Sequence, residues 1–149
     1  MGGEPYWYYV KYQADINAAL QALRQQEFMA GRYAPVIMFL CDLFPLGPDA
    51  PAPGAQHETI DEAREETEEM GTRSILDLDH VSTDPEFCAV CPLPDDVLRR
   101  LYGTTQPTRA LFDKTMDVFE GIDRGQGVYV VLYQDGKPHE ICFAGYSFD

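Results

Sequence analysis

Basic residues are scarce in this sequence: Lys and Arg together number 11 against 25 Asp and Glu, a formal net charge of −14. A surface of this sign repels phosphate backbones, which argues against nonspecific binding to nucleic acid. Long hydrophobic runs are missing as well, since apolar stretches such as 36–41 are far shorter than the roughly 20 residues that span a bilayer. We therefore expect neither nucleic acid nor a membrane among the partners of this chain.

A secretory leader is not visible in the residues that open the sequence. Met1-Gly2-Gly3-Glu4-Pro5 has neither a basic start nor an apolar stretch, and Tyr6 stands where a myristoylation motif needs Ser or Thr. We therefore expect a cytoplasmic protein. A length of 149 residues, with 45% hydrophobic and 12% aromatic residues, predicts one globular domain over 1–149.

Cysteine occurs at only four positions, Cys41, Cys88, Cys91 and Cys142. Because the chain is long enough to fold without covalent links, free thiols in apolar surroundings are expected rather than disulfides. The Cys88-Ala-Val-Cys91 spacing lies in an apolar stretch and not at the start of a helix, and no second close pair of ligands accompanies it. We expect neither redox chemistry nor a bound metal.

Strong catalytic and cofactor motifs are absent from the sequence. There is no phosphate-binding loop, no GxGxxG, no GxSxG and no HExxH. This lowers the odds of the common enzyme classes without excluding others. We expect no cofactor and assign no catalytic residue.

Regular patterns in the first part of the chain predict a strand, a helix and a second strand. Aromatic and β-branched residues fill 6–12, which favours a pleated, half-buried surface. Over 15–30, apolar residues recur every three or four positions between a capping Asp15 and a closing Gly31. The apolar run 36–41 suits an interior strand, with a buried loop as the alternative.

A proline-rich loop and a capped helix come next. The segment 44–54 contains four prolines, which cannot sustain a helix or a central strand, so it predicts a surface loop. Thr59 and Glu62 then match a capping box, in which two side chains satisfy backbone amides reciprocally. With Gly71 as a stop, these residues predict a helix over 59–70.

The second half predicts two strands and then two helices. Apolar and polar residues alternate over 74–81, close to the period of a strand with one solvated face, and 87–93 is a second strand beside it. A short helix is expected from Pro94 to Gly103. Another is expected over 107–120, capped by Thr105 or Gln106 with Pro107 at its first position.

The last predicted element is a β-hairpin. Asp135-Gly136 joins the strand-like runs 128–133 and 140–148, and this dipeptide is a strong signal for a tight turn. Strands that end in a hairpin rather than alternating with helices throughout indicate an α+β fold. We predict a mixed or mainly antiparallel sheet of about five to six strands, with helices packed on one face.

Acidic residues are concentrated in the helix predicted over 59–70. Its packing stripe consists of apolar and small residues only: Ile60, Ala63, Thr67 and Met70. Like charges four residues apart cost a few tenths of a kcal/mol per pair, so helix stability does not explain the remaining acids. We expect the solvent-facing acids to bind a basic protein partner, and they are Glu62, Glu65, Glu66 and Glu69.

This interaction hypothesis rests on an analogy of size and charge with bacterial immunity proteins and nucleic-acid mimics, not on a shared motif. A second hypothesis is that the charge only keeps the protein in solution. A third is a small-molecule site or an enzyme site built from polar loop residues, namely Gln56, His57, Arg73, Thr105, Gln106 and Arg109. In that set His57 is the candidate base, but no nucleophile accompanies it, and a solvated loop histidine is the simpler interpretation. The oligomeric state is left open.

Overall fold

The structure is a computed structural model that describes residues 3–115 and 117–148. These residues form five strands, four α-helices and three short 3-10 helices. In chain order they are β1 (Pro5–Lys11), α1 (Ile16–Ala30), η1 (Leu40–Leu43), α2 (Ile60–Glu66), η2 (Ile75–Asp77), β2 (His80–Val81), β3 (Ala89–Pro92), α3 (Asp95–Tyr102), α4 (Arg109–Asp113), η3 (Asp117–Gly121), β4 (Gly127–Gln134) and β5 (Lys137–Tyr146). Within these described residues, no helix is long and apolar enough to cross a membrane.

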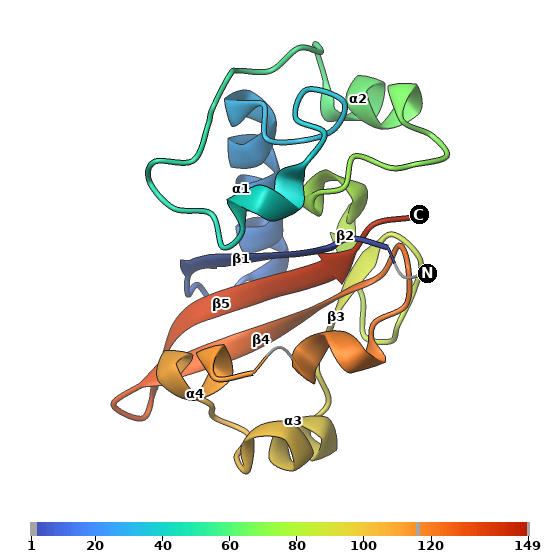
Figure 1. The fold of residues 1–149 in the computed structure, drawn as a ribbon. Coiled ribbons are helices and arrows are strands. Elements are labelled where there is room, and N and C mark those ends of the chain that lie inside the picture. Colours follow the sequence, from blue (N-terminus) through green and yellow to red (C-terminus); the bar gives the residue numbers. More distant parts are fainter. Residues whose placement is uncertain (1–2, 116, 149) are drawn as a thin grey trace.

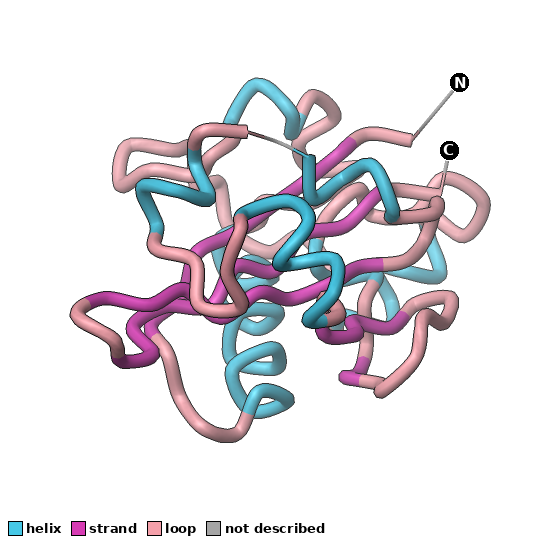
Figure 2. Tube along the Cα trace, turned by 90° about the horizontal axis from the view of Figure 1, so that it is seen from below, coloured by secondary structure: helices cyan, strands magenta, loops and turns pink. Residues whose placement is uncertain are grey.

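The strands form one mixed sheet in the order β1-β5-β4-β3-β2. β5 pairs antiparallel with both β1 and β4, whereas β3 is parallel to β2 and to β4. Figure 2 shows the strands side by side, with helices on either side of them. The predicted α+β class, mixed sheet and C-terminal hairpin are confirmed.

Helices cover both faces of this sheet, so the prediction of helices on one face only was wrong. Alternate residues of β5 enter two different cores: Ile141 and Phe143 pack with α1 residues, whereas Cys142 and Ala144 pack with α3 and α4 residues. Figure 1 shows α1 and α2 above the sheet and α3 and α4 below it. The reason is visible in the sequence, because β1 and β5 are apolar at odd and even positions alike.

Local signals placed α1 and the hairpin correctly. Asp15 accepts a hydrogen bond from the Ala18 N–H (3.0 Å), and Gly31 closes the helix with φ 77°. Asp135 and Gly136 have φ 53° and 76°, the left-handed pair that a two-residue hairpin turn requires. The strand predicted over 6–12, the loop at 44–54 and the helix after Pro94 are also present.

The strand predicted at 36–41 is not formed. This segment is a turn that leads into η1, and most of it is not buried: Phe39 is 71% exposed, and only Leu40 is buried. The Ile37 N–H donates to the Tyr33 carbonyl at 2.9 Å, so the backbone bonds locally instead of joining a ladder.

The strand predicted over 74–81 is reduced to β2, because its first part forms η2. Ser74 caps this turn by accepting from the Leu76 N–H. Asp77, expected on a solvated face, has no exposed surface. Its carboxylate accepts hydrogen bonds from Thr72 inside the protein. Asp77 therefore does not face solvent as the alternating pattern predicted. The strand predicted over 87–93 is present as β3, next to β2.

Two predicted helices are shorter than expected. The helix at 59–70 starts at its Thr59 cap but ends at Glu66, so Glu68 and Glu69 lie in the turn that follows. The helix predicted over 107–120 consists of α4 and η3, and Met116 between them lies outside the described residues. Thr108 caps α4, because the Pro107 carbonyl accepts the Tyr133 N–H from β4 and holds Pro107 outside the helix.

Candidate functional site

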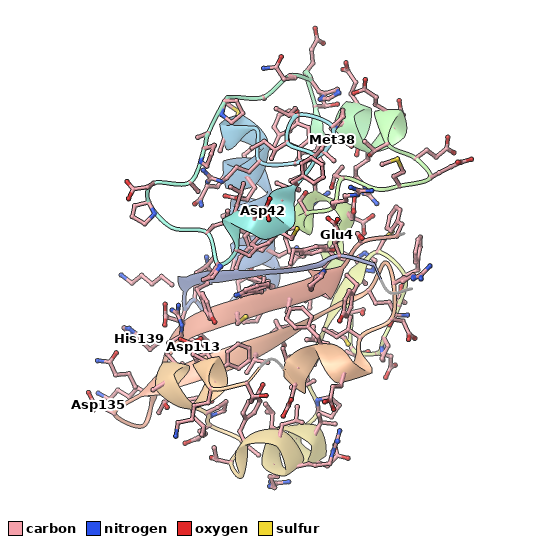
Figure 3. The ribbon with its side chains drawn as sticks, in the orientation of Figure 1. Glu4, Met38, Asp42, Asp113, Asp135 and His139 are labelled. Atoms are coloured by element: carbon pink, nitrogen blue, oxygen red, sulfur yellow. The ribbon has the colours of Figure 1, made fainter. Side chains whose placement is uncertain are left out.

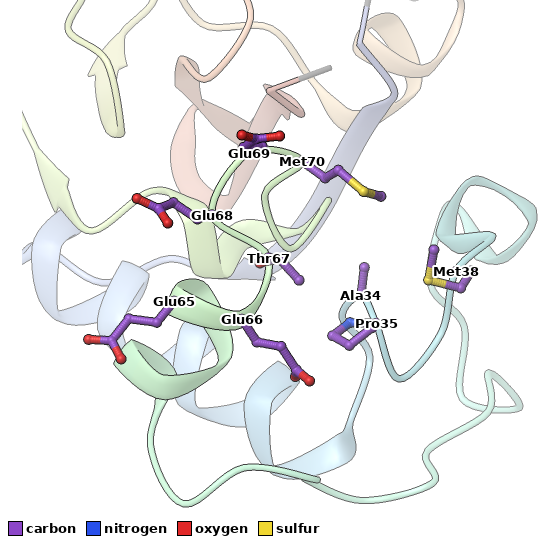
Figure 4. A pocket seen from close by; sticks show the side chains of 9 residues that line it. All are labelled: Ala34, Pro35, Met38, Glu65, Glu66, Thr67, Glu68, Glu69 and Met70. Atoms are coloured by element: carbon purple, nitrogen blue, oxygen red, sulfur yellow. The ribbon is translucent and has the colours of Figure 1, made fainter.

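The end of α2 and the turn after it form one wall of a surface groove, which we call the acidic groove. Its volume is about 560 Å³. The opposite wall comes from the segment just after α1, and the lining residues are Ala34, Pro35, Met38, Glu65, Glu66, Thr67, Glu68, Glu69 and Met70. Figure 4 shows Glu66 and Met70 extending toward Pro35 and Met38, whereas Glu65 and Glu68 extend to the other side of the turn.

The groove combines negative charge with exposed apolar side chains. All four of its glutamates are exposed, and its lining includes no basic residue. Met38 and Met70 are each 39% exposed, and the neighbouring Phe39 is more exposed still. The groove therefore places acidic and apolar contacts side by side.

Three of the four glutamates expected to bind a partner lie in this groove: Glu65, Glu66 and Glu69. Glu62 is exposed but lies one turn earlier on α2. The sequence did not indicate the methionines. Met70 was expected to pack as part of the helical stripe, but α2 ends before it, and Met38 was expected inside the protein.

His57 is linked to the groove through a hydrogen-bonded chain. Its Nδ1 lies 2.8 Å from the hydroxyl of Tyr33, which also accepts the Gln56 N–H at 3.1 Å. Its Nε2 bonds with the Glu66 carboxylate. Because the His57 side chain is only 9% exposed, the interpretation as a solvated loop histidine was wrong. The chain Tyr33–His57–Glu66 fastens the segment between the proline-rich loop and α2 to the segment after α1 and to the last residue of α2.

Removal of the Tyr33 hydroxyl tests this link. In Tyr33→Phe, the Gln56 N–H and the His57 Nδ1 lose a buried partner, so we expect the free energy of unfolding to fall by about 1–2 kcal/mol. Urea denaturation measures the loss, and amide hydrogen exchange at Gln56 should become faster. Tyr12→Phe is the matched control, and an equal loss in both variants would show that the hydroxyl contributes nothing specific.

The other polar candidates lie in different places. Arg73 contacts the Met38 carbonyl (3.5 Å) and Glu4 (3.9 Å). Thr105 and Gln106 are in the turn before α4, where the Gln106 N–H donates to Thr104. The six residues suggested by the sequence are therefore divided between opposite sides of the sheet.

Arg109 is committed to acidic neighbours. Its guanidinium lies 3.2 Å above the Tyr9 ring and binds Asp113 at 3.0 Å and Glu140 at 3.2 Å. In Figure 3, Asp113 lies near the hairpin end of the sheet, far from Met38. An anionic ligand would have to displace both carboxylates from Arg109, which does not support the suggested small-molecule site at this residue.

The thiols are in unequal environments. Cys91 and Cys142 are buried, as expected, and burial raises the pKa of both thiols, which disfavours the reactive thiolate. Cys88 is half-buried and Cys41 is exposed, so the expectation of burial was wrong for Cys41. None of the four is in a disulfide, and no cluster of three metal-ligating side chains occurs in 3–115 or 117–148.

Sequence reasoning also missed two buried carboxylates. Glu27 is 1% exposed and binds Arg32 through both oxygens, at 2.8 and 2.7 Å. The other is Asp77, behind α2.

No family model matches this chain, and no match was found among curated proteins or solved structures.

Proposed function

We propose that this protein is an interaction domain whose acidic groove binds a basic segment of a partner protein. The observation that carries the proposal is the groove itself, which is lined by four exposed glutamates and by the exposed Met38 and Met70. The net charge of −14 supports the same partner chemistry, because it attracts a basic surface over a distance of about one Debye length.

The apolar side chains of the groove would contact the partner and stabilise the complex after charge attraction has brought the partner to the groove. Methionine is flexible and polarisable, so it adapts to partners of different shape. Phe39, beside the groove in sequence, adds a large exposed ring of the type that anchors interfaces. Solubility alone would be served by the acids without these residues, which favours the interaction hypothesis over the hypothesis that the charge is only solubilising.

The link between His57 and Glu66 suits such a role. It positions one glutamate at the groove, while Glu65 and Glu69 have no ion pair among the described residues. Pre-ordering a charged side chain reduces the entropy lost when a partner binds. The buried Tyr33 offers no access for a substrate, so the same chain is poorly suited to catalysis.

The test compares two variants that lose the same charge. The groove variant changes Glu62, Glu65, Glu66 and Glu69 to Gln. The control variant changes exposed acids elsewhere to their amides, at Asp49, Glu120, Asp123 and Asp135. A synthetic peptide of alternating Lys and Leu serves as the defined probe, and partners captured from the native cells by the wild type are measured in the same way.

At low salt we expect the groove variant to associate about tenfold more slowly than the wild type, and the control variant to remain within about threefold. The difference should shrink at high salt, because screening weakens steering. Stopped-flow or surface-based kinetics measure the on-rates. If the two variants slow association equally, net charge and not the groove directs binding, and the proposal is wrong.

A further inference from the structure

A second cavity lies on the other side of the turn after α2. Its volume is about 450 Å³, and its lining includes Asp61, Glu65, Glu68, Asp77, Phe87 and Phe148. We call it the Asp77 cavity. It shares Glu65 and Glu68 with the acidic groove, whereas Asp61, Asp77 and the two aromatic rings line this cavity and not the groove.

Asp77 is a buried carboxylate that is only half satisfied. Its Oδ1 accepts hydrogen bonds from the Thr72 N–H and the Thr72 hydroxyl, both at 2.8 Å. Its Oδ2 is buried with no hydrogen-bond partner among the described residues. Burial raises the pKa of this carboxyl group, against the opposing effects of the hydrogen bonds from Thr72, the positive charge of Arg64 and the Arg73 backbone N–H. A buried polar group without a partner costs about 1–3 kcal/mol, and a charged one costs more.

The position of Oδ2 is fixed by its surroundings. A Cβ atom placed on Gly71 would lie 2.7 Å from Oδ2 and 3.0 Å from the Phe148 ring, so the oxygen lies beside that ring. The Phe148 ring in turn packs against Phe87, with centroids 4.9 Å apart. Phe148 lies two residues after the end of β5.

The charge balance of the cavity is negative. Arg64 is the one basic residue in its lining, and it is already engaged with Asp79 (3.0 Å) and with the Asp77 carbonyl (3.3 Å). The exposed acids at the rim, Asp61, Glu65 and Glu68, are not neutralised by it. A ligand that enters meets acids at the rim and aromatic walls, and the buried Asp77 carboxylate lies behind them.

We propose that the Asp77 cavity binds an organic cation, namely a primary ammonium group on a short apolar stem. Asp77 provides the counter-charge and a free acceptor, and Phe87 and Phe148 contact the stem and attract the cation through their ring faces. The volume lies within the range of small-ligand pockets. A free amine and a lysine side chain of a protein share this chemistry.

The experiment is a titration of the isotope-labelled protein followed by amide NMR shifts. The probes are n-butylammonium chloride, a blocked Gly-Lys-Gly tripeptide and 1-pentanol, a neutral molecule of similar shape. We expect saturable shifts at Gly71, Asp77 and Phe148 with butylammonium, and binding of pentanol at least about tenfold weaker. Shifts with the tripeptide as well would identify a lysine side chain as an accepted source, and shifts with butylammonium alone would restrict the site to free amines.

Asp77→Asn should weaken butylammonium binding at least about tenfold, because it keeps the shape and removes the charge. If this variant does not fold, Asp61→Asn at the exposed rim is expected to weaken binding about threefold. Glu69 lines the acidic groove and not the Asp77 cavity, so Glu69→Gln should leave amine binding unchanged. The failure of the amine-site proposal is therefore distinguishable from the failure of the proposed function. Equal binding of pentanol, equal shifts with sodium chloride, or no saturable shift would overturn the assignment.

Discussion

Arg32→Met is expected to lower the free energy of unfolding by about 3–5 kcal/mol, because it leaves a buried carboxylate without its partner. Glu27 is 1% exposed, and both of its oxygens bind the Arg32 guanidinium, at 2.8 and 2.7 Å. Hydrogen bonding to Glu27 raises the pKa of Arg32, so the guanidinium is charged at every ordinary pH. Methionine preserves much of the apolar stem but offers no donor to either oxygen.

The pH dependence gives this prediction a sign. A buried carboxylate without a cationic partner is costly only while it is charged. The deficit of the variant should therefore shrink as the pH falls into the range in which carboxyl groups become protonated. Urea denaturation at several pH values measures it.

Two variants test whether the loss comes from the buried charge. Arg124→Met, at an exposed position, should change stability by less than about 0.5 kcal/mol. Combining Glu27→Met with Arg32→Met should recover much of the loss, since replacing a whole buried pair by apolar residues is often near neutral. A deficit that is the same at all pH values, or that the double variant does not reduce, would argue against the charge as its cause.

Gly31→Ala is the second variant with a large expected effect: we expect it to lower the free energy of unfolding by roughly 3–5 kcal/mol, for two separate reasons. Gly31 has φ 77°, a conformation that costs a residue with a Cβ about 1–3 kcal/mol. A Cβ there would also lie 2.2 Å from the carbonyl oxygen of Gly54, so the proline-rich loop must move. That movement also threatens the hydrogen bond from the Gly54 N–H to the Ala30 carbonyl (2.9 Å).

Gly136→Ala separates the two reasons. Gly136 has nearly the same φ, 76°, but nothing lies within 4 Å of its added Cβ, so only the conformational strain remains. We expect a loss of about 1 kcal/mol there. Denaturation midpoints of the two variants measure the difference, and equal losses would show that the contact between Gly31 and the loop is unimportant.

What the sequence predicted correctly depends on neighbours along the chain. The Asp15 and Thr59 caps, the Gly31 stop and the Asp135-Gly136 turn all act over three or four residues, and each lies where it was expected. The apolar character of β4 and β5 likewise predicted the hairpin that anchors the α+β fold.

The predictions that were wrong depend on partners distant in sequence or in another element. Whether Asp77 faces solvent is decided by Thr72 and by the packing around η2, and an alternating pattern carries no information on that. The strand predicted at 36–41 needed a neighbouring strand to pair with. It does not form, because the Ile37 N–H bonds locally to the Tyr33 carbonyl. The sequence also offered no means of predicting the contact between His57 and Tyr33, because Tyr33 lies 24 residues earlier in the chain.

The candidate site was predicted in part for the same reason. The acids after Thr59 are exposed, as the narrow packing stripe indicated, but Met38 joins them only because the chain turns back after α1. The half-satisfied carboxylate of Asp77 had no signal in the sequence at all, since an aspartate inside an apparent strand normally faces water.

The sheet order has a consequence for how the chain is made. β1 leaves the ribosome first, yet its neighbour in the sheet is β5, and Tyr6 pairs with Gly145. Until that last strand is synthesised, the aromatic residues of β1 have no edge to bond with and neither core is complete. Long-range pairing of this kind is slow and leaves apolar surface open in the meantime. A high net charge of one sign, −14 over the full sequence, opposes association between molecules in this incomplete state.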